Sequence, residues 1–260
     1  MSNLPPTNLP PPEQTIYRPA SSMSAPLIVM IVLLLCSVPA IGILAGLLLP
    51  AIHQAREAAR RMSCSSNVRQ IEIALLNYES ANKCLPPAYT VDSNGKKLHS
   101  WRTLILPYLE QQALYDSIDL TKPWDDPGNA AALETVVGIY SCPSLPIEKT
   151  QTTYKVVVDP TSAFPGDQSR KLSEITDGTS NTVFVFESDI YSAVHWMNPN
   201  DATMNDFLNN GKGSSKVIHF GGFHIGMGDG FLRFLPTDTQ DKTKQAMVTV
   251  GGGENFGNFD

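Results

Sequence analysis

The chain has 260 residues, and its 25 Asp and Glu against 19 Lys and Arg give a net charge of −6. An acidic chain with no long Lys/Arg run lacks the phosphate-contacting track that nucleic-acid binding needs. Once the N-terminal tail and apolar run are set aside, about 200 residues remain, enough for one sizeable domain or a helix plus a β-rich domain. These numbers argue against a nucleic-acid-binding protein.

Proline dominates the first 24 residues. Six prolines occur there, with Ser and Asn between them: Pro5, Pro6, Pro10, Pro11, Pro12 and Pro19. Such a segment cannot bury a core and should sample polyproline II or disordered conformations. We predict that residues 1–24 are a disordered, Pro-rich tether, with a ligand for a proline-binding partner as the alternative.

A long apolar run follows the tail. The 23 residues from Leu27 to Leu49 include no charged side chain. As a helix they extend roughly 34 Å at about 1.5 Å per residue, enough to cross a hydrocarbon core of about 30 Å. We therefore predict a transmembrane helix over residues 25–52, with the lipid bilayer contacted through residues 27–49.

A cleaved signal peptide is the alternative to a permanent anchor. The segment before the apolar run is long and has only Arg18 as a positive charge. The sequence Val38-Pro39-Ala40 ends in a small residue but carries proline inside the cleavage site. We predict an uncleaved signal anchor, kinked at Pro39.

An amphipathic helix is predicted from Ile52 to Ala81. Apolar residues recur there every three or four positions, as in Val68, Ile71 and Leu75, so one face should pack on a sheet. The helix should end before Pro86 and Pro87, because proline disfavours a helical conformation in the residue that precedes it. We expect His53 to be solvated or interfacial, because no second ligand lies one turn away.

Aromatic residues occur at regular intervals in the segment His99–Tyr115. Trp101, Tyr108 and Tyr115 recur there every seven residues. Such a row could stack on a ligand, but we interpret it as a packed core face.

The second half of the chain is rich in predicted strands. Residues 152–158 read as a strand, and the polar turn 174–182 leads into another strand at 183–187. Asp229-Gly230 lies between two apolar runs and predicts a tight hairpin turn. Residues 251–260 are rich in Gly and Asn and are expected to be a flexible C-terminus.

Candidate metal ligands occur in two places. Asp177, Ser180 and Asn181 offer oxygen ligands on one turn and are weak calcium candidates, with a hydrogen-bonded turn as the preferred interpretation. His219, His224 and Asp229 could meet a metal on one hairpin. Residues five apart on a strand point to opposite faces, however, so we do not expect that site.

Motifs of catalysis are missing from the sequence. It has no Gly-x-Ser-x-Gly, no HExxH and no phosphate loop. We expect no enzymatic activity and no catalytic residues. Calcium, at the weak candidate site described above, is the one cofactor considered.

Four sequence blocks resemble one known family. They surround Pro50, Trp101, Asp177 and Asp229, and the first reads AIGILAGLLLPAIHQAREAARRMSCSSNVRQIEIALLNY. They resemble type IV pilins and pseudopilins, specifically the bacterial pilin-like proteins grouped as domain-of-unknown-function family 1559, over about residues 40–250. The resemblance implies an α+β fold, in which a long N-terminal helix, part membrane anchor and part amphipathic spine, packs on an antiparallel sheet. It also implies a short helix after the spine, in the segment His99–Tyr115.

The chain departs from the pilin pattern at the processing site. Pilin-like precursors carry Gly-Phe-Thr-Leu-Ile-Glu and are cut after the glycine. On alignment, the glycine falls at Ile28 and the glutamate at Leu33. The departure implies that prepilin-peptidase processing does not occur and that the glutamate which registers filament subunits is missing.

Two features of the sequence predict opposite orientations of the domain relative to the membrane. Arg56, Arg60, Arg61 and Arg69 follow the apolar run, so the positive-inside rule alone would leave the domain in the cytoplasm. The resemblance implies a pilin-like α+β extracytoplasmic domain over residues 53–250, held at the bacterial inner membrane. We follow the resemblance.

The resemblance also implies a disulfide. Four cysteines occur, of which Cys36 lies in the predicted anchor, and none forms a CxxC pair. Cys64 and Cys142 match cysteines of the family signatures, whereas Cys84 stands where an apolar aromatic residue is usual. The implied pair is Cys64–Cys142, with Cys84 free. Three reduced thiols remain the alternative if the domain is cytoplasmic.

Two functions follow from the resemblance. The first is a membrane-anchored, pseudopilin-like structural or assembly protein of the bacterial cell envelope or of a type II secretion-like apparatus, with other membrane or envelope proteins as partners. The alternative is an extracytoplasmic binding module for a small solute or glycan, because the family is also filed as solute-binding-protein-like.

Overall fold

The structure is a computed structural model that describes residues 24–213 and 219–253, without the side chains of residues 36–48, 50, 51 and 53. The chain divides into two units, Met1–His53 and Gln54–Asp260. The predicted tail before residue 24 and the last seven residues of the predicted C-terminus lie outside the described residues. So do the side chains of Pro39 and His53.

Helix α1 (Ala25–Asn82) opens the described chain. It ends where Lys83 adopts a left-handed backbone (φ 64°), just before Pro86 and Pro87. Among the described residues, no helix combines the length and apolar character needed to cross a membrane. More than half of the side chains in the predicted span, residues 25–52, lie outside the part of the chain that the structure describes.

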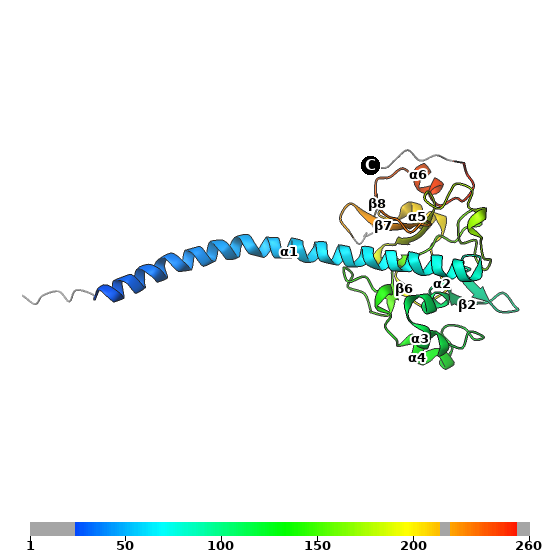
Figure 1. Ribbon diagram of the computed structural model, residues 1–260, viewed down its shortest axis with the longest axis horizontal. Helices are drawn as coiled ribbons and strands as arrows, with labels where there is room; N and C mark the ends of the chain where they lie inside the picture. Colours follow the sequence, from blue (N-terminus) through cyan, green and yellow to red (C-terminus); the bar gives the residue numbers. More distant parts are fainter. Residues whose placement is uncertain (1–23, 214–218, 254–260) are drawn as a thin grey trace, which may run out of the picture. The chain divides into compact units, whose positions relative to one another are not determined.

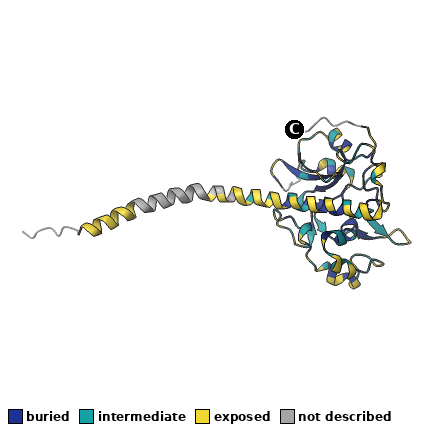
Figure 2. Cartoon of the chain, viewed as in Figure 1, coloured by how far each residue is buried: buried dark blue, intermediate teal, exposed yellow. Residues whose placement is uncertain are grey.

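One stripe of α1 belongs to the core of the unit Gln54–Asp260. Cys64, Val68, Ile71 and Leu75 are fully buried at spacings of three or four residues, and the opposite face is exposed (Figure 2). This is the pattern of a helix that packs one face on a sheet, as its sequence predicts.

The sheet under this stripe has four antiparallel strands (Figure 1). Their order is β4 (Tyr154–Lys155), β5 (Val183–Glu187), β7 (Gly222–Met227) and β8 (Leu232–Pro236). The mixed α+β class with antiparallel sheets is therefore confirmed. Strands β7 and β8 form the predicted hairpin, in whose turn Gly230 has φ 83°.

The prediction of one strand is wrong. The strand expected over 152–158 is split into β3 (Gln151–Thr152) and β4, because β3 pairs with β6 (Val194–His195) whereas β4 pairs with β5. The segment 99–115, where the resemblance implies a short helix, has three short helical pieces: α2 (Trp101–Leu104), η1 (Leu106–Leu109) and α3 (Gln112–Asp116). Pro107 cannot donate a helical hydrogen bond, and Glu110 turns left-handed at φ 59°.

The remaining elements are short. Strands β1 (Tyr89–Val91) and β2 (Lys97–Ser100) form a hairpin ahead of α2. The other pieces are η2 (Pro127–Asn129), α4 (Ala130–Leu133), η3 (Gly138–Tyr140), η4 (Leu172–Glu174), η5 (Ile190–Ser192), α5 (Met204–Asn209) and α6 (Asp241–Ala246). The aromatic row is a core feature, as interpreted from sequence: Trp101 is fully buried, and Tyr108 and Tyr115 pack against the core.

Strand β5 contributes to two hydrophobic clusters. Phe184 belongs to the cluster that includes the α1 stripe. Phe186 belongs to a second cluster, where its ring lies 4.8 Å from that of Phe207 on α5. All five residues of β5 are buried, which explains its uninterrupted apolar run.

Helix α1 contacts β7 closely at Gly226. A side-chain carbon at this glycine would collide with the carboxylate of Glu72 on α1. Glu72 is fully buried, and neither carboxylate oxygen has a hydrogen-bond partner among the described residues. Burial, helped by the charge of Asp229, raises the pKa of Glu72 well above its ordinary value, although the nearby Val185 backbone works in the opposite direction.

We predict that Glu72→Gln stabilises the domain at neutral pH. A raised folded-state pKa means that Glu72 favours folding below its unfolded pKa of about 4.3, and that this contribution is lost as pH rises. Glutamine mimics the protonated acid, so the variant should be more stable by about 1–3 kcal/mol at pH 7 and nearly equal near pH 4. Urea unfolding at both pH values measures the difference.

The matched control for this prediction is Glu79→Gln, which changes a half-buried glutamate on the same helix. It should leave stability within about 0.5 kcal/mol at both pH values. A Glu72→Gln variant that is no more stable than the parent chain at pH 7 would contradict the prediction.

Candidate functional site

A buried acid lies between two histidines on the face of the sheet nearest α1. Phe186 pairs with Ile225, so Glu187 at the end of β5 lies opposite His224 on β7. The Glu187 Oε2 accepts hydrogen bonds from the backbone N–H of His224 and from its ring Nδ1, both at 2.8 Å. We call Glu187, His219 and His224 the Glu187 cluster.

His219 completes the cluster from outside the strand. Its Nε2 lies 3.6 Å from Glu187 Oε2, and its ring centroid lies 4.9 Å from that of His224. The sequence prediction that His219 and His224 point to opposite faces is therefore wrong. The chain reverses at Gly221 (φ 86°), so His219 bridges back to Gly222 and does not continue strand β7. Asp229 lies in the hairpin turn and is not part of the cluster.

The Glu187 cluster is almost closed to solvent. The side chains of Glu187 and His219 are fully buried, and only that of His224 is partly exposed, at 12%. Burial by itself raises the pKa of Glu187, but the contacts with His219 and His224 outweigh it, and the pKa lies below its ordinary value. His224 makes the shorter contact. Glu187 is thus a buried carboxylate that is held in its charged form.

Three polar atoms of the cluster have no hydrogen-bond partner among the described residues. They are Glu187 Oε1 and both ring nitrogens of His219. Buried polar atoms are nearly always hydrogen-bonded, so three such atoms together mark a place where a further group can bind.

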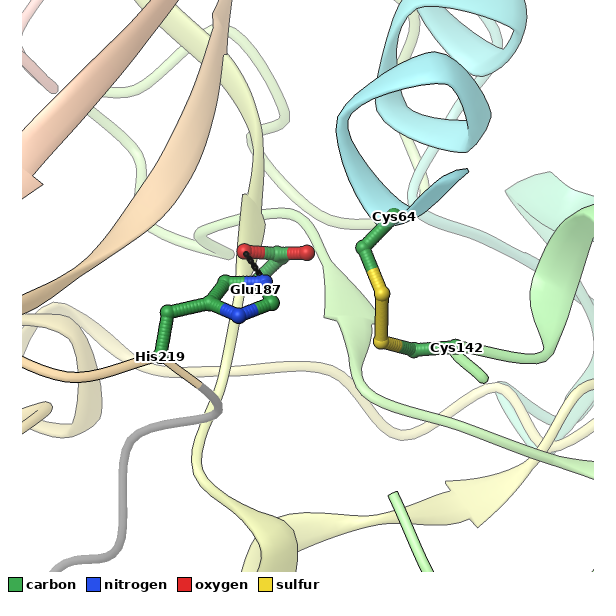
Figure 3. A group of neighbouring side chains, drawn as sticks. All are labelled: Cys64, Cys142, Glu187 and His219. Carbon is green, nitrogen blue, oxygen red and sulfur yellow. Dashed lines mark ion pairs between the residues drawn. A yellow bond between two sulfur atoms is a disulfide. The ribbon is translucent and has the colours of Figure 1, made fainter. Parts of the chain in front are cut away.

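The Cys64–Cys142 disulfide lies beside these atoms (Figure 3). It joins α1 to the segment after η3, with a Cα–Cα distance of 5.2 Å, and it is the pair that the resemblance implied. Cys84 is free and half-buried. One ligand-type atom from each of Cys64, Cys142, Glu187 and His219 lies within 4.8 Å of the other three.

The predicted calcium candidates form a hydrogen-bonded turn. Both carboxylate oxygens of Asp177 accept backbone N–H groups, from Gly252 at 2.7 Å and Gly253 at 2.9 Å. Asn181 donates its side-chain amide to the Asp177 carbonyl at 2.9 Å. Ser180 offers its carbonyl to Arg233 at 3.4 Å. The carboxylate therefore fastens the C-terminal segment to this turn.

A separate cleft opens on the other side of strand β5. It has a volume of about 400 Å³, and the charged residues that line it include Lys155, Asp189, Asp206 and Lys212. Lys155 is almost fully buried, and burial lowers its pKa. The mixture of two cations and two carboxylates suits a polar ligand more than an apolar one. We call it the Lys155 cleft.

Sequence reasoning missed both Glu187 and the Lys155 cleft. Glu187 ends a predicted strand and carries no motif around it, and its partners follow 32 and 37 positions later in the chain. Only the strand register and the reversal at Gly221 bring them together. The one available signal was a carboxylate at the end of a fully apolar strand, where an unpaired charge would be costly.

The comparison with known families gives one match. Residues 53–167 match the model of the family described as "Protein of unknown function (DUF1559)", filed under the solute-binding-type title SBP_bac_10. The match agrees with the domain-of-unknown-function family 1559 that the sequence blocks indicated, and it covers less than half of the chain. The block around Trp101 lies inside the matched segment, and those around Asp177 and Asp229 lie beyond it. No curated protein and no solved structure matches the chain.

We predict that the disulfide contributes strongly to stability. It closes a loop of 78 residues, for which the chain-entropy model gives about 4–5 kcal/mol at most. The double variant Cys64→Ser/Cys142→Ser should lose about 2–5 kcal/mol of unfolding free energy, measured by denaturant unfolding. Cys84→Ser is the matched control and should change little.

Peptide mapping without reduction tests the pairing itself. A Cys64–Cys142 peptide is expected from the native protein. A Cys84–Cys142 peptide, or alkylation of Cys64, Cys84 and Cys142 together after denaturation without reduction, would contradict it.

Proposed function

We propose that the chain is a membrane-anchored, pseudopilin-like structural or assembly protein of the bacterial cell envelope, without catalytic activity. In this proposal, residues 25–52 anchor the chain in the inner membrane, and the domain that follows is held outside the cytoplasm. The anchor rests on the charge-free run Leu27–Leu49, which is long enough to cross a hydrocarbon core.

The observation that carries the proposal is the way in which α1 enters the domain. The buried stripe from Cys64 to Leu75 is part of the main hydrophobic cluster, so this helix cannot be removed without exposing the core. This helix directly follows the apolar segment and also forms the spine of the domain. If the membrane holds the apolar segment, the helix attaches the domain to the membrane. This is the arrangement expected of an assembly subunit.

The disulfide supports the proposed location. Disulfides persist in oxidising compartments such as the periplasm and are rare in the cytoplasm. The Cys64–Cys142 bond joins the spine helix to the segment after η3, so it would resist local unfolding of the domain next to the membrane. This favours the extracytoplasmic orientation over the one that the positive-inside rule gives.

A binding module is the second candidate, and the Lys155 cleft favours it. A volume of about 400 Å³ lies within the usual range of small-molecule sites, about 300–1,000 Å³. A solute with both positive and negative groups, or a glycan rich in hydroxyls, would complement the charged and amide side chains there. The family name, with its solute-binding title, is consistent with this alternative.

Co-purification distinguishes the two functions. The full chain, tagged at its C-terminus, is extracted in detergent and purified, and the associated proteins are identified by mass spectrometry. The assembly role predicts a reproducible set of envelope membrane proteins. A matched chain in which residues 27–49 are replaced by an unrelated transmembrane helix should retain those partners that bind through the domain.

The opposite outcome supports the binding module. In that case the chain purifies alone, a solute raises its melting temperature, and Lys155→Met abolishes the shift. This result would contradict the assembly role.

A further inference from the structure

The Glu187 cluster and the disulfide beside it provide four potential metal ligands. Cys64, Cys142, Glu187 and His219 are all buried, and one ligand-type atom of each lies within 4.8 Å of the others. Figure 3 shows these side chains converging from α1, the segment after η3, the end of β5 and the segment before β7. Two sulfurs, one imidazole and one carboxylate are ligand types that zinc prefers.

The oxygen and nitrogen atoms that would bind the metal are not used in hydrogen bonds, and the two sulfurs are joined in the disulfide. Glu187 Oε1 and both nitrogens of His219 make no hydrogen bond among the described residues. Glu187 Oε2, in contrast, is occupied by two hydrogen bonds from His224. The carboxylate is therefore oriented through one oxygen and has the other available. This is how a neighbouring group commonly holds a metal ligand in place.

The spacing is close to that of a tetrahedral zinc site. Zinc bonds of about 2.0–2.3 Å keep the ligand atoms about 3.3–3.8 Å apart. The four atoms here already lie within 4.8 Å of one another, so adjustments of about 1 Å would complete the site. The Cα–Cα distance of 5.2 Å between Cys64 and Cys142 leaves room for their sulfurs to separate once they are no longer bonded.

We propose that reduction of the Cys64–Cys142 disulfide converts this cluster into a zinc site held by Cys64, Cys142, Glu187 and His219. The disulfide and the metal are mutually exclusive, because zinc binds thiolates and the sulfurs of a disulfide are poor ligands. His224 is a positioning residue that holds Glu187. The proposal does not depend on the assembly role or on the solute-binding alternative.

The chemistry of the switch balances with a dithiol reductant. The reductant gives two electrons and two protons to the S–S bond, becomes a disulfide itself, and leaves two thiols on this chain. On binding zinc, each thiol releases its proton to solvent as its sulfur coordinates the metal. The two thiolates and the Glu187 carboxylate then compensate the charge of the buried dication.

Metal titration of the full chain in detergent micelles tests the proposal. Zinc is titrated against a chromophoric chelator, with the chain either oxidised or reduced by a phosphine. The reduced chain should bind one zinc ion, and the oxidised chain should bind it roughly 100-fold more weakly or not at all. Cobalt should give a tetrahedral ligand-field spectrum with sulfur-to-metal charge transfer in the reduced chain only.

Variants separate the site from nonspecific binding to thiols. His219→Gln and Glu187→Gln keep both cysteines and should each weaken zinc binding to the reduced chain, by roughly 10- to 100-fold or more. Cys64→Ser/Cys142→Ser should not bind zinc under either condition. His195→Gln changes a half-buried histidine that bonds the Leu133 carbonyl, and it should bind zinc as the parent chain does.

Circular dichroism recorded during the titrations reports whether each variant is folded. Equal zinc affinity of the oxidised and reduced chains would overturn the proposal. So would binding to the reduced chain that is unchanged in both His219→Gln and Glu187→Gln, because the thiols alone would then account for it. A reduced chain that binds no zinc would overturn it as well.

Discussion

Helix α1 approaches strand β7 so closely that a side chain at Gly226 would collide with Glu72. This approach sets the position of the helix over the sheet, because the buried stripe Cys64–Leu75 can pack on β5 only if β7 presents a flat surface beneath it. It also explains why β7 presents glycine and histidine on the face toward α1, and Phe223, Ile225 and Met227 on the other. The cost is a buried carboxyl without a hydrogen bond, which is tolerable because its pKa is raised by burial.

A second constraint fixes the segments around the sheet. Arg102 and Asp201 form a fully buried ion pair at 2.7 Å. The guanidinium also donates to the Tyr154 carbonyl and to the Ser100 hydroxyl, and the carboxylate accepts from the backbone of Val156 and the indole of Trp101. Removing one partner of such a pair commonly costs about 3–5 kcal/mol, because it leaves a buried charge uncompensated. The pair therefore holds α2 against β4 with a specificity that apolar packing alone would not give.

The elements that the sequence predicted well are those with local signals. The stripe of Val68, Ile71 and Leu75 follows from helical periodicity, and the β7–β8 hairpin follows from Asp229-Gly230. The Glu187 cluster has no such signal. It depends on the register between β5 and β7 and on the reversal of the chain at Gly221. The rule that side chains five residues apart on a strand point to opposite faces does not apply to His219, because His219 lies outside the strand. The Cys64–Cys142 pair came from the resemblance, because three cysteines in a domain allow three pairings.

We propose that the disulfide-linked domain is held outside the cytoplasm, and the thiol of Cys84 allows this location to be measured directly. Cys84 is the free, half-buried thiol of the domain. A membrane-impermeant maleimide is added to intact spheroplasts, and the labelled residues are identified by mass spectrometry, with Cys84→Ser as the control. The account predicts labelling of Cys84 before lysis, and labelling of Cys64 and Cys142 only after reduction. Labelling of Cys84 that requires lysis, or labelling of all three thiols without reduction, would contradict it.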